Sequence, residues 1–514
     1  MSQVERHSEK RQAIESADSF ASGLSFTVVT NIVQRGVGFI RNVALCHFLS
    51  DDKLGLWALA SCFFMLAAPL SVMGLPGCFG KFVEYYRVRG QLHGFVQRVT
   101  IGAFLGSAAF FGFIVYFSNA SSQLAFGETL SRSTMVLVGL VLLGVTWFNF
   151  VVELLSGLRR PKTVSSMLLI NSLAFTVLAL GVCVVQPSWQ GLVVAFGLSA
   201  ILGLYPAVKS LRTSPSENAD LAASISMGEM WRRVLPYAVS MWTMNLLVNS
   251  FEVVDRYMLL YLIDDKNGLG HRLIGQFHSA RLLPVLLFSL ATVVSGMLLP
   301  YLSADWERNR RQQVAASTRA TLKFAAVAFM AFSVCAIAFA PYLFGLLLKD
   351  RFSLGQHVMP VAMVCCVWTS LTFIAQNYLW CAEKTRAITL SLAVGLVVNI
   401  VLNFLFIPQW GLHGAVWATA IASAINLGLV IWSMQRNGCE LTKSMVVFLA
   451  LPLLIAFSTE VAAIGLAVLI LVAGRTQLLL TRDEKRMVEN ALKPMFALIN
   501  WHRPCFATVG ERVN

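Results

Sequence analysis

Charged residues are scarce in this sequence. Only 13% of the 514 residues are Asp, Glu, Lys or Arg, whereas a soluble domain carries about 25%. Hydrophobic residues make up 57% of the chain, and the mean hydropathy is +0.69. This composition argues against a soluble globular domain and is typical of a protein that crosses a membrane many times.

Catalytic motifs are also missing. The sequence contains no Walker A motif, no HExxH pair and no GxSxG nucleophile elbow. Its ten cysteines form no CxxC and have no metal-like spacing with histidine, so we interpret them as small apolar packing residues. We therefore expect that the protein is not an enzyme and that it has no catalytic residue and no metal site. The only cofactor expected is a coupling ion, H⁺ or Na⁺.

The N-terminal segment lacks an apolar stretch, so we expect no cleaved signal peptide and a retained first span. The net charge is +14, which in a soluble protein would suggest nucleic acid. Here the basic residues fall in short loops between apolar spans, without any nucleic-acid-binding module. We therefore expect contact with membrane lipids and no nucleic-acid partner.

Apolar stretches of about 20 residues, long enough to cross the hydrocarbon core, recur along the chain. We predict twelve spans near residues 25–49, 54–78, 99–118, 134–155, 164–185, 191–208, 234–262, 275–302, 321–348, 356–381, 387–407 and 412–435. The stretch 444–480 is long for one helix and short for two, and it contains Pro452 and Glu460.

The distribution of basic residues predicts the orientation. With the N-terminus inside, cytoplasmic segments hold 30 of the 40 Lys and Arg, opposite loops hold six, and four lie within spans. Because the basic C-terminal tail also belongs inside, the number of crossings should be even. We therefore divide 444–480 in two and predict about fourteen spans, with thirteen as the alternative. Both termini should be cytoplasmic.

Polar residues follow one face of the first span. Read as a helix, the span places four positions on this face: Asn31, Arg35, Gly38 and Asn42. Arg41 also lies in its interior. Charge inside a bilayer normally faces a bundle interior or a water-filled cavity, although arginines also extend to the interface or pair with acids. Guanidinium groups suit a diphosphate. We predict substrate contacts from Asn31, Arg35 and Arg41.

The polar pattern returns 214 residues later with the same spacing, at Asn245, Asn249, Glu252 and Arg256. Two six-span halves of parallel topology follow from this repeat, and an alternating-access transporter with its site between them is the natural interpretation. The predicted organisation is a cytoplasmic segment 1–24, an N-lobe 25–210, a cytoplasmic linker 211–233, a C-lobe 234–436, two last spans in 444–480 and a cytoplasmic tail 481–514.

This second polar segment contains both acidic and basic residues, Glu252, Asp255 and Arg256. Asp255 and Arg256 diverge by about 100° on a helix, so their partners should lie on other helices, while Glu252 and Arg256 are spaced to pair directly. A structural ion pair and a substrate or coupling-ion contact both fit. We predict substrate contacts from Arg256 and Arg281, and we assign ion coupling or pairing to Glu252 and Asp255, with Glu252 preferred for coupling.

Two further titratable residues lie near span ends. His278 is three residues before Arg281, and we interpret it as an interfacial histidine. Glu153 lies at the cytoplasmic end of the fourth span, where we expect it to pair with Arg159 or Arg160 as a structural residue.

Several motifs together indicate a family. The motif AEKTR (382–386), Asn399, Asn403 and IPQWGLHGAVWATAIAS (407–423) resemble the polysaccharide exporters of the multidrug/oligosaccharidyl-lipid/polysaccharide superfamily. So do VVDRYMLLYLI (253–263), GQFHSARLLP (275–284) and LGLWALA (54–60). The resemblance implies an all-α membrane protein with two six-helix lobes in a V shape and two C-terminal helices.

The resemblance also implies an activity, the flipping of a polyprenyl-diphosphate-linked oligosaccharide across the bacterial inner membrane. A polysaccharide polymerase and glycosyltransferases would then be partners. A lipid II flippase is a substrate variant of this hypothesis. A multidrug/cation antiporter of the same superfamily is the alternative, and it would require acids and aromatics in the cavity. A non-transporting scaffold is a third class without local sequence support.

Overall fold

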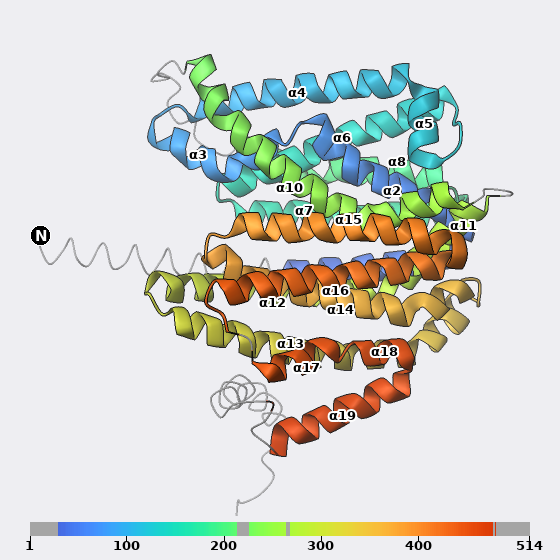
Figure 1. Ribbon diagram of the computed structural model, residues 1–514. Helices are drawn as coiled ribbons and strands as arrows, with labels where there is room; N and C mark the ends of the chain where they lie inside the picture. The colour runs from blue at the N-terminus through green and yellow to red at the C-terminus, as the bar shows by residue number, and fades with distance from the viewer. Residues whose placement is uncertain (1–28, 213–225, 264–267, 441, 476–478, 480–514) are drawn as a thin grey trace, which may run out of the picture.

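The computed structural model describes residues 29–212, 226–263, 268–440, 442–475 and 479. Over these residues the regular secondary structure is entirely helical (Figure 1), which confirms the predicted all-α class. The predicted N-terminal segment 1–24 and tail 481–514 lie outside the described residues.

The first half of the chain begins with a helix over residues 29–48. The elements that follow are α2 (Asp51–Ser71), η1 (Leu75–Cys78), α3 (Phe79–Val88), α4 (Leu92–Tyr116), α5 (Ser118–Phe126), α6 (Arg132–Gly157), α7 (Pro161–Val185), α8 (Trp189–Gly203) and α9 (Tyr205–Arg212). The predicted span 54–78 is wrong at its end, because the helix stops at Ser71. Gly74 then adopts a left-handed φ of 69° and η1 starts with Pro76 near its N-terminus.

The second half repeats the pattern with longer helices. Its elements are α10 (Met227–Leu262), α11 (Leu269–Ala280), α12 (Leu282–Glu307), α13 (Arg311–Tyr342), η3 (Leu343–Leu347), α14 (Ser353–Cys381), α15 (Thr385–Trp410) and α16 (Leu412–Arg436). The predicted span 275–302 consists of two helices, α11 and α12, with Arg281 at the joint between them.

The ambiguous stretch 444–480 forms two helical segments. The first consists of α17 (Lys443–Ala450) and α18 (Leu453–Phe457), interrupted at Pro452. Ser458 then caps α19 (Thr459–Arg475) by accepting a hydrogen bond from the Val461 amide at 3.0 Å. Helix α19 lies against α18 and α13. The described part of 444–480 thus forms two helical segments, and whether each crosses the membrane stays a prediction.

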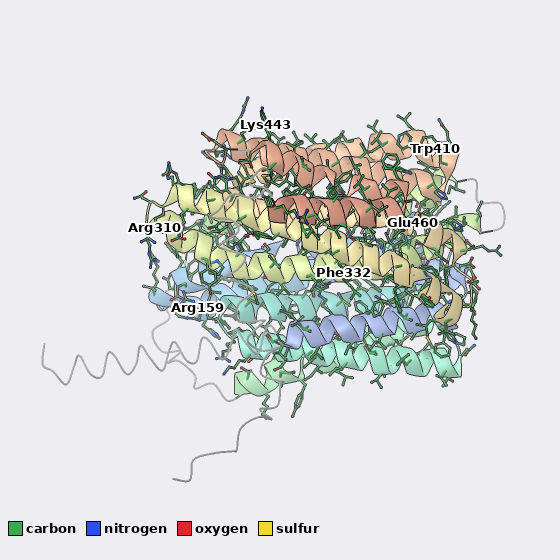
Figure 2. The ribbon with its side chains drawn as sticks, turned by 90° about the horizontal axis from the view of Figure 1, so that it is seen from below. Arg159, Arg310, Phe332, Trp410, Lys443 and Glu460 are labelled. Carbon is green, nitrogen blue, oxygen red and sulfur yellow. The ribbon has the colours of Figure 1, made fainter. Side chains whose placement is uncertain are left out.

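Ten described helices are long and apolar enough to cross a membrane. The helix over residues 29–48 and α10 are not among the ten, and these are the two elements that carry the polar stripes. Figure 2 shows Arg159, Arg310 and Lys443 at one end of the bundle and Trp410 at the other. We call the first end the basic end and the second the opposite end.

Helices α10 and α11 connect the two halves (Figure 1). Helix α10 contacts α2 and η1 of the first half as well as α15 and α16 of the second, and α11 packs along α2 and α14. One large apolar core runs through both halves. A second, smaller core joins α3, α4 and the start of α10 near the basic end.

Candidate substrate cavity

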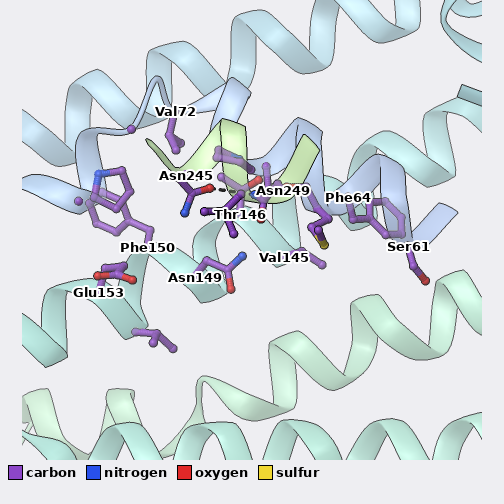
Figure 3. A pocket seen from close by; sticks show the side chains of 18 of the residues that line it. Ser61, Phe64, Val72, Val145, Thr146, Asn149, Phe150, Glu153, Asn245 and Asn249 are labelled. Atoms are coloured by element: carbon purple, nitrogen blue, oxygen red, sulfur yellow. Dashed lines mark hydrogen bonds between the residues drawn. The ribbon is translucent and has the colours of Figure 1, made fainter. Parts of the chain in front are cut away.

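A cavity of about 880 Å³ lies between α2, α6 and α10 (Figure 3). Because α6 has a helical repeat of 3.6 residues, one of its faces supplies a continuous wall. That wall consists of Val145, Thr146, Asn149, Phe150, Val152 and Glu153. The cavity is thus lined by alternating apolar and polar groups rather than by apolar side chains alone.

The facing wall comes from α10, and a proline explains how α10 docks on α2. Pro69 has no amide N–H, so the Met65 carbonyl one turn earlier loses its helical donor. The Asn249 side chain donates to that carbonyl at 3.0 Å and to Asn245 Oδ1 at 2.8 Å. Trp242 Nε1 donates to the Pro69 carbonyl at 3.1 Å. The predicted polar positions Asn245 and Asn249 therefore fix the two lobes together at the cavity.

Arg41 lines the cavity together with Asn42. Its guanidinium carbon lies 4.4 Å from the centre of the Phe175 ring, a cation–π contact. Nη1 makes a long contact of 3.5 Å with Thr176 Oγ1, and the buried Nε–H has no acceptor in the described part of the chain. The guanidinium is held by a ring face while part of its donor capacity stays unused.

Arg256 lies beside the same region without a carboxylate partner among the described residues. Its Nη1 is 3.2 Å from Cys62 Sγ and 3.4 Å from the Glu252 carbonyl oxygen. Its buried Nε–H also lacks an acceptor. The Glu252 carboxylate, whose spacing allowed a pair with Arg256, instead contacts Arg281 at 2.5 Å.

The joint between α11 and α12 positions Arg281 for this ion pair. Arg281 and Arg256 share one ring, with guanidinium carbons 5.8 and 5.7 Å from the centre of Phe277. His278, one turn before Arg281, lines the cavity, and its buried Nε2 has no hydrogen-bond partner. The expectation of an interfacial histidine was therefore wrong, because α11 turns this ring inward.

Asp255 faces away from the cavity and is only 2% exposed. Its carboxylate accepts hydrogen bonds from Asn403 Nδ2 at 2.8 Å, Asn399 Nδ2 at 3.1 Å and Thr419 Oγ1 at 2.5 Å. The prediction that its partners lie on other helices is confirmed, since they belong to α15 and α16. Thr419 was missed, because nothing in its local sequence distinguishes it from other threonines in apolar spans.

Three side-chain donors compensate the charge of the Asp255 carboxylate. Asn399 Oδ1 in turn accepts from Asn403 Nδ2, and Thr419 Oγ1 accepts from Asn399 Nδ2, whereas the buried Asn403 Oδ1 has no donor among the described residues. In the described part of the chain no group of three His, Cys, Asp or Glu side chains is arranged to hold a metal ion. Glu252 is paired with Arg281, whereas Asp255 is held by amide and hydroxyl donors.

The polar face of the helix over residues 29–48 reaches the cavity only near the C-terminal end of that helix. Asn42 lines the cavity, whereas Asn31 and Arg35 do not, and Arg35 is exposed. The cavity begins deeper along this helix, near Arg41. The structure thus brings Arg41, Arg256 and Arg281 toward one region and leaves Arg35 and Asn31 outside it.

Glu153 is the cavity residue that the sequence interpretation assigned wrongly. It lines the cavity and has no hydrogen bond or ion pair among the described residues. Arg159, with a left-handed φ of 59°, turns away and lies 3.8 Å from the Glu84 carboxylate. Arg160 bonds to Ser210 at 2.7 Å. The predicted ion pair of Glu153 with Arg159 or Arg160 is therefore not formed among the described residues.

The sequence and the fold are both similar to those of known membrane proteins. The family model described as lipid II flippase MurJ matches residues 279–482. The solved structure of "Lipid II flippase MurJ, inward closed conformation" superposes with a TM-score of 0.68 and 12% identity, covering 91% of this chain and 99% of that chain. The family match covers less than half of this chain, and at 12% identity the superposition shows a shared fold.

A transporter of the multidrug/oligosaccharidyl-lipid/polysaccharide (MOP) superfamily also has a similar fold. An inward-facing multidrug resistance MATE family transporter superposes with a TM-score of 0.61 and 12% identity, covering 80% of this chain and 98% of that chain. "Stage V sporulation protein B" of Bacillus subtilis (strain 168) is 31% identical over 73 residues, which is 14% of this chain and 14% of that relative's length. The MurJ and MATE proteins are a flippase and a transporter rather than enzymes.

Proposed function

We propose that this protein flips a polyprenyl-diphosphate-linked saccharide across the bacterial inner membrane by alternating access. The observation that carries the proposal is the pair of guanidiniums, Arg41 in the cavity wall and Arg256 beside it, whose buried Nε–H donors have no acceptor among the described residues. Buried polar groups are nearly always hydrogen-bonded, so unused charged donors at a cavity call for an anionic ligand. A diphosphate supplies oxygen acceptors in the geometry that guanidinium forks prefer.

Two lines of support point to different saccharides. The match to the MurJ family model supports lipid II, and the exporter-like motifs support a polysaccharide repeat unit. The prenyl diphosphate is common to both. In either role the basic end would face the cytoplasm, where the lipid is made, and the enzymes that build or polymerise the saccharide would be partners.

The test is transport by the full-length protein in liposomes. Fluorescent lipid II and a fluorescent undecaprenyl-diphosphate-linked oligosaccharide are added to one leaflet, and their appearance in the other is followed by chemical quenching. We expect wild-type protein to accelerate the flipping of at least one, and Arg41→Gln with Arg256→Gln to abolish it. Unchanged flipping by the double variant, or no flipping of either lipid, would contradict the proposal.

We further propose that a cation bound at Asp255 drives the cycle. Asp255 is a buried carboxylate without an ion pair among the described residues, and either protonation or binding of Na⁺ would neutralise its charge. A Na⁺ gradient without a pH gradient, compared with the reverse, separates the two ions. Flipping that depends on neither gradient would argue against coupling at this site.

The cation antiporter remains a second candidate because of Glu153. An unpaired carboxylate among aromatic rings is the feature expected of a cavity for organic cations. Resistance to cationic dyes conferred by expression, and lost in Glu153→Gln, would favour this function over lipid flipping.

A further inference from the structure

One end of the cavity is cationic. Arg41 lies over Phe175, whose ring centre is 5.2 Å from that of Phe196. Phe196 in turn stacks on Phe64 at 5.8 Å. This chain of ring contacts places Arg41 at the end of the cavity that Phe64 lines.

The other guanidiniums lie near the same end. Arg256 contacts Cys62 at 3.2 Å, and Cys62 follows Ser61, a cavity residue next to Phe64. Arg281 shares the Phe277 ring with Arg256. Three guanidiniums thus lie near that end, and Glu252 pairs with one of them, Arg281.

The other end of the cavity carries Glu153. Figure 3 shows Glu153 beside Phe150 at one end of the labelled side chains and Ser61 and Phe64 at the other, with Asn149 between them. Along the α6 wall, Val145 and Glu153 are separated by about 12 Å of helical rise. The cavity is therefore bipolar, with opposite charges at its two ends.

No group of the described chain neutralises Glu153. The basic residues that follow it in sequence are engaged by Glu84 and Ser210. The Glu153 side chain is exposed at the cavity, and an unpaired carboxylate there repels an anionic ligand unless the ligand brings a compensating positive charge.

We infer that the saccharide head group carries a protonated amine, which Glu153 binds while the guanidiniums hold the diphosphate. This inference rests on the proposed function and narrows its substrate class. Between the two charges, the side-chain amides of Asn149, Asn245 and Asn249 face the neutral part of the head group. The amine belongs either to an amino sugar or to a diamino acid of an attached peptide.

The experiment measures binding to the full-length protein in nanodiscs with matched lipids. One pair is undecaprenyl diphosphate carrying glucosamine or N-acetylglucosamine. The other pair is lipid II with a free or an Nε-acetylated lysine. We expect wild-type protein to bind the free-amine member of at least one pair about tenfold more tightly, the size of one charge-assisted contact. The pair that shows this preference identifies the source of the amine.

Two variants complete the test. Glu153→Gln should remove the preference and raise the affinity for undecaprenyl diphosphate itself, because the repelling carboxylate is gone. Retained diphosphate binding also shows that the variant is folded. Glu128→Gln, which alters an exposed carboxylate outside the cavity, should retain the preference. A preference that survives Glu153→Gln, or equal binding within both pairs by wild-type protein, overturns the inference. Failure of wild-type protein to bind undecaprenyl diphosphate overturns the proposed function and the inference with it.

Discussion

At the scale of single residues, the arginines of this protein are held by rings as much as by acids. Arg41 rests on Phe175, and Arg256 and Arg281 share Phe277. A ring face attracts a guanidinium without using its N–H donors, which stay in the plane of the group. The arginines are thereby oriented before a ligand arrives, with donors left for it.

The first residue-scale prediction compares two arginines of the same helix. Arg41→Gln should weaken binding of undecaprenyl diphosphate roughly tenfold, because charge-assisted hydrogen bonds contribute about 1.5–3 kcal/mol. Arg35→Gln is the matched control, since Arg35 is exposed and does not line the cavity. The affinity for undecaprenyl diphosphate is measured in nanodiscs. An equal loss of affinity in the two variants would show that Arg41 does not contribute through its position in the cavity.

The second residue-scale prediction concerns the buried carboxylate of Asp255. Asp255→Asn keeps the shape of the side chain but points an amide N–H toward the donors of Asn399 and Asn403. We expect the variant to lose about 1–3 kcal/mol of stability, the cost of unsatisfied buried polar groups. Denaturation in detergent measures this loss, with Glu128→Gln as the control. A stability equal to that of wild-type protein would mean that the carboxylate is already protonated.

At the scale of helices, α2 and α11 cross with backbone against backbone. A Cβ atom built on Gly55 would lie 1.9 Å from the His271 carbonyl oxygen, and one on Gly275 would lie 2.0 Å from the Asp51 carbonyl oxygen. Only glycine permits this approach at the opposite end of the bundle. The crossing joins the two halves directly, through a helix of each.

The element-scale prediction tests this crossing with the smallest possible side chain. Gly275→Ala or Gly55→Ala should force α2 and α11 apart, because a backbone carbonyl cannot yield as a flexible side chain does. We expect lower thermal stability and slower lipid flipping. Gly181→Ala on α7, where a Cβ would meet nothing within 4 Å, should behave as wild type. Wild-type flipping by Gly275→Ala would show that the transport cycle does not require this contact.

At the scale of the molecule, the two halves also meet near the basic end. The smaller apolar core joins Phe79, Phe82 and Phe95 of α3 and α4 to Val234 and Ala238 of α10. Arg233 of α10 stacks on Tyr85 of α3 with its guanidinium carbon 4.2 Å from the ring centre. Alternating access requires these contacts to separate when the cavity opens toward this end.

The prediction at this scale is a reversible lock. A Cβ atom on Gly77 would lie 3.3 Å from Met241 Cβ, close to the separation of about 3.5–4.5 Å found in disulfides. In Gly77→Cys/Met241→Cys, oxidation should form a disulfide and stop lipid flipping, and a reductant should restore it. The two single variants are controls. Full flipping after quantitative oxidation would mean that this end stays closed throughout the cycle.

Hydropathy predicted where the helices are, because it depends on the local chain. Each of the twelve predicted spans is mainly helical over its described residues, and the stretch around Pro452 divides into two segments. The errors lie where the backbone turns within an apolar stretch, as at Gly74 and Arg281. Neither turn changes the hydropathy, so a periodicity argument passes over both.

The sequence by itself determined the helical membrane class, the repeated polar stripes and the residue types that suit a diphosphate. Only the tertiary structure decided which charges meet. Glu252 pairs with Arg281 rather than with Arg256, and the Asp255 side chain is enclosed by α15 and α16. Glu153 lines the cavity without a basic partner among the described residues. The physical reason is that spacing fixes neighbours within one helix, whereas contacts between helices depend on crossings set by glycine and proline positions far away in the chain.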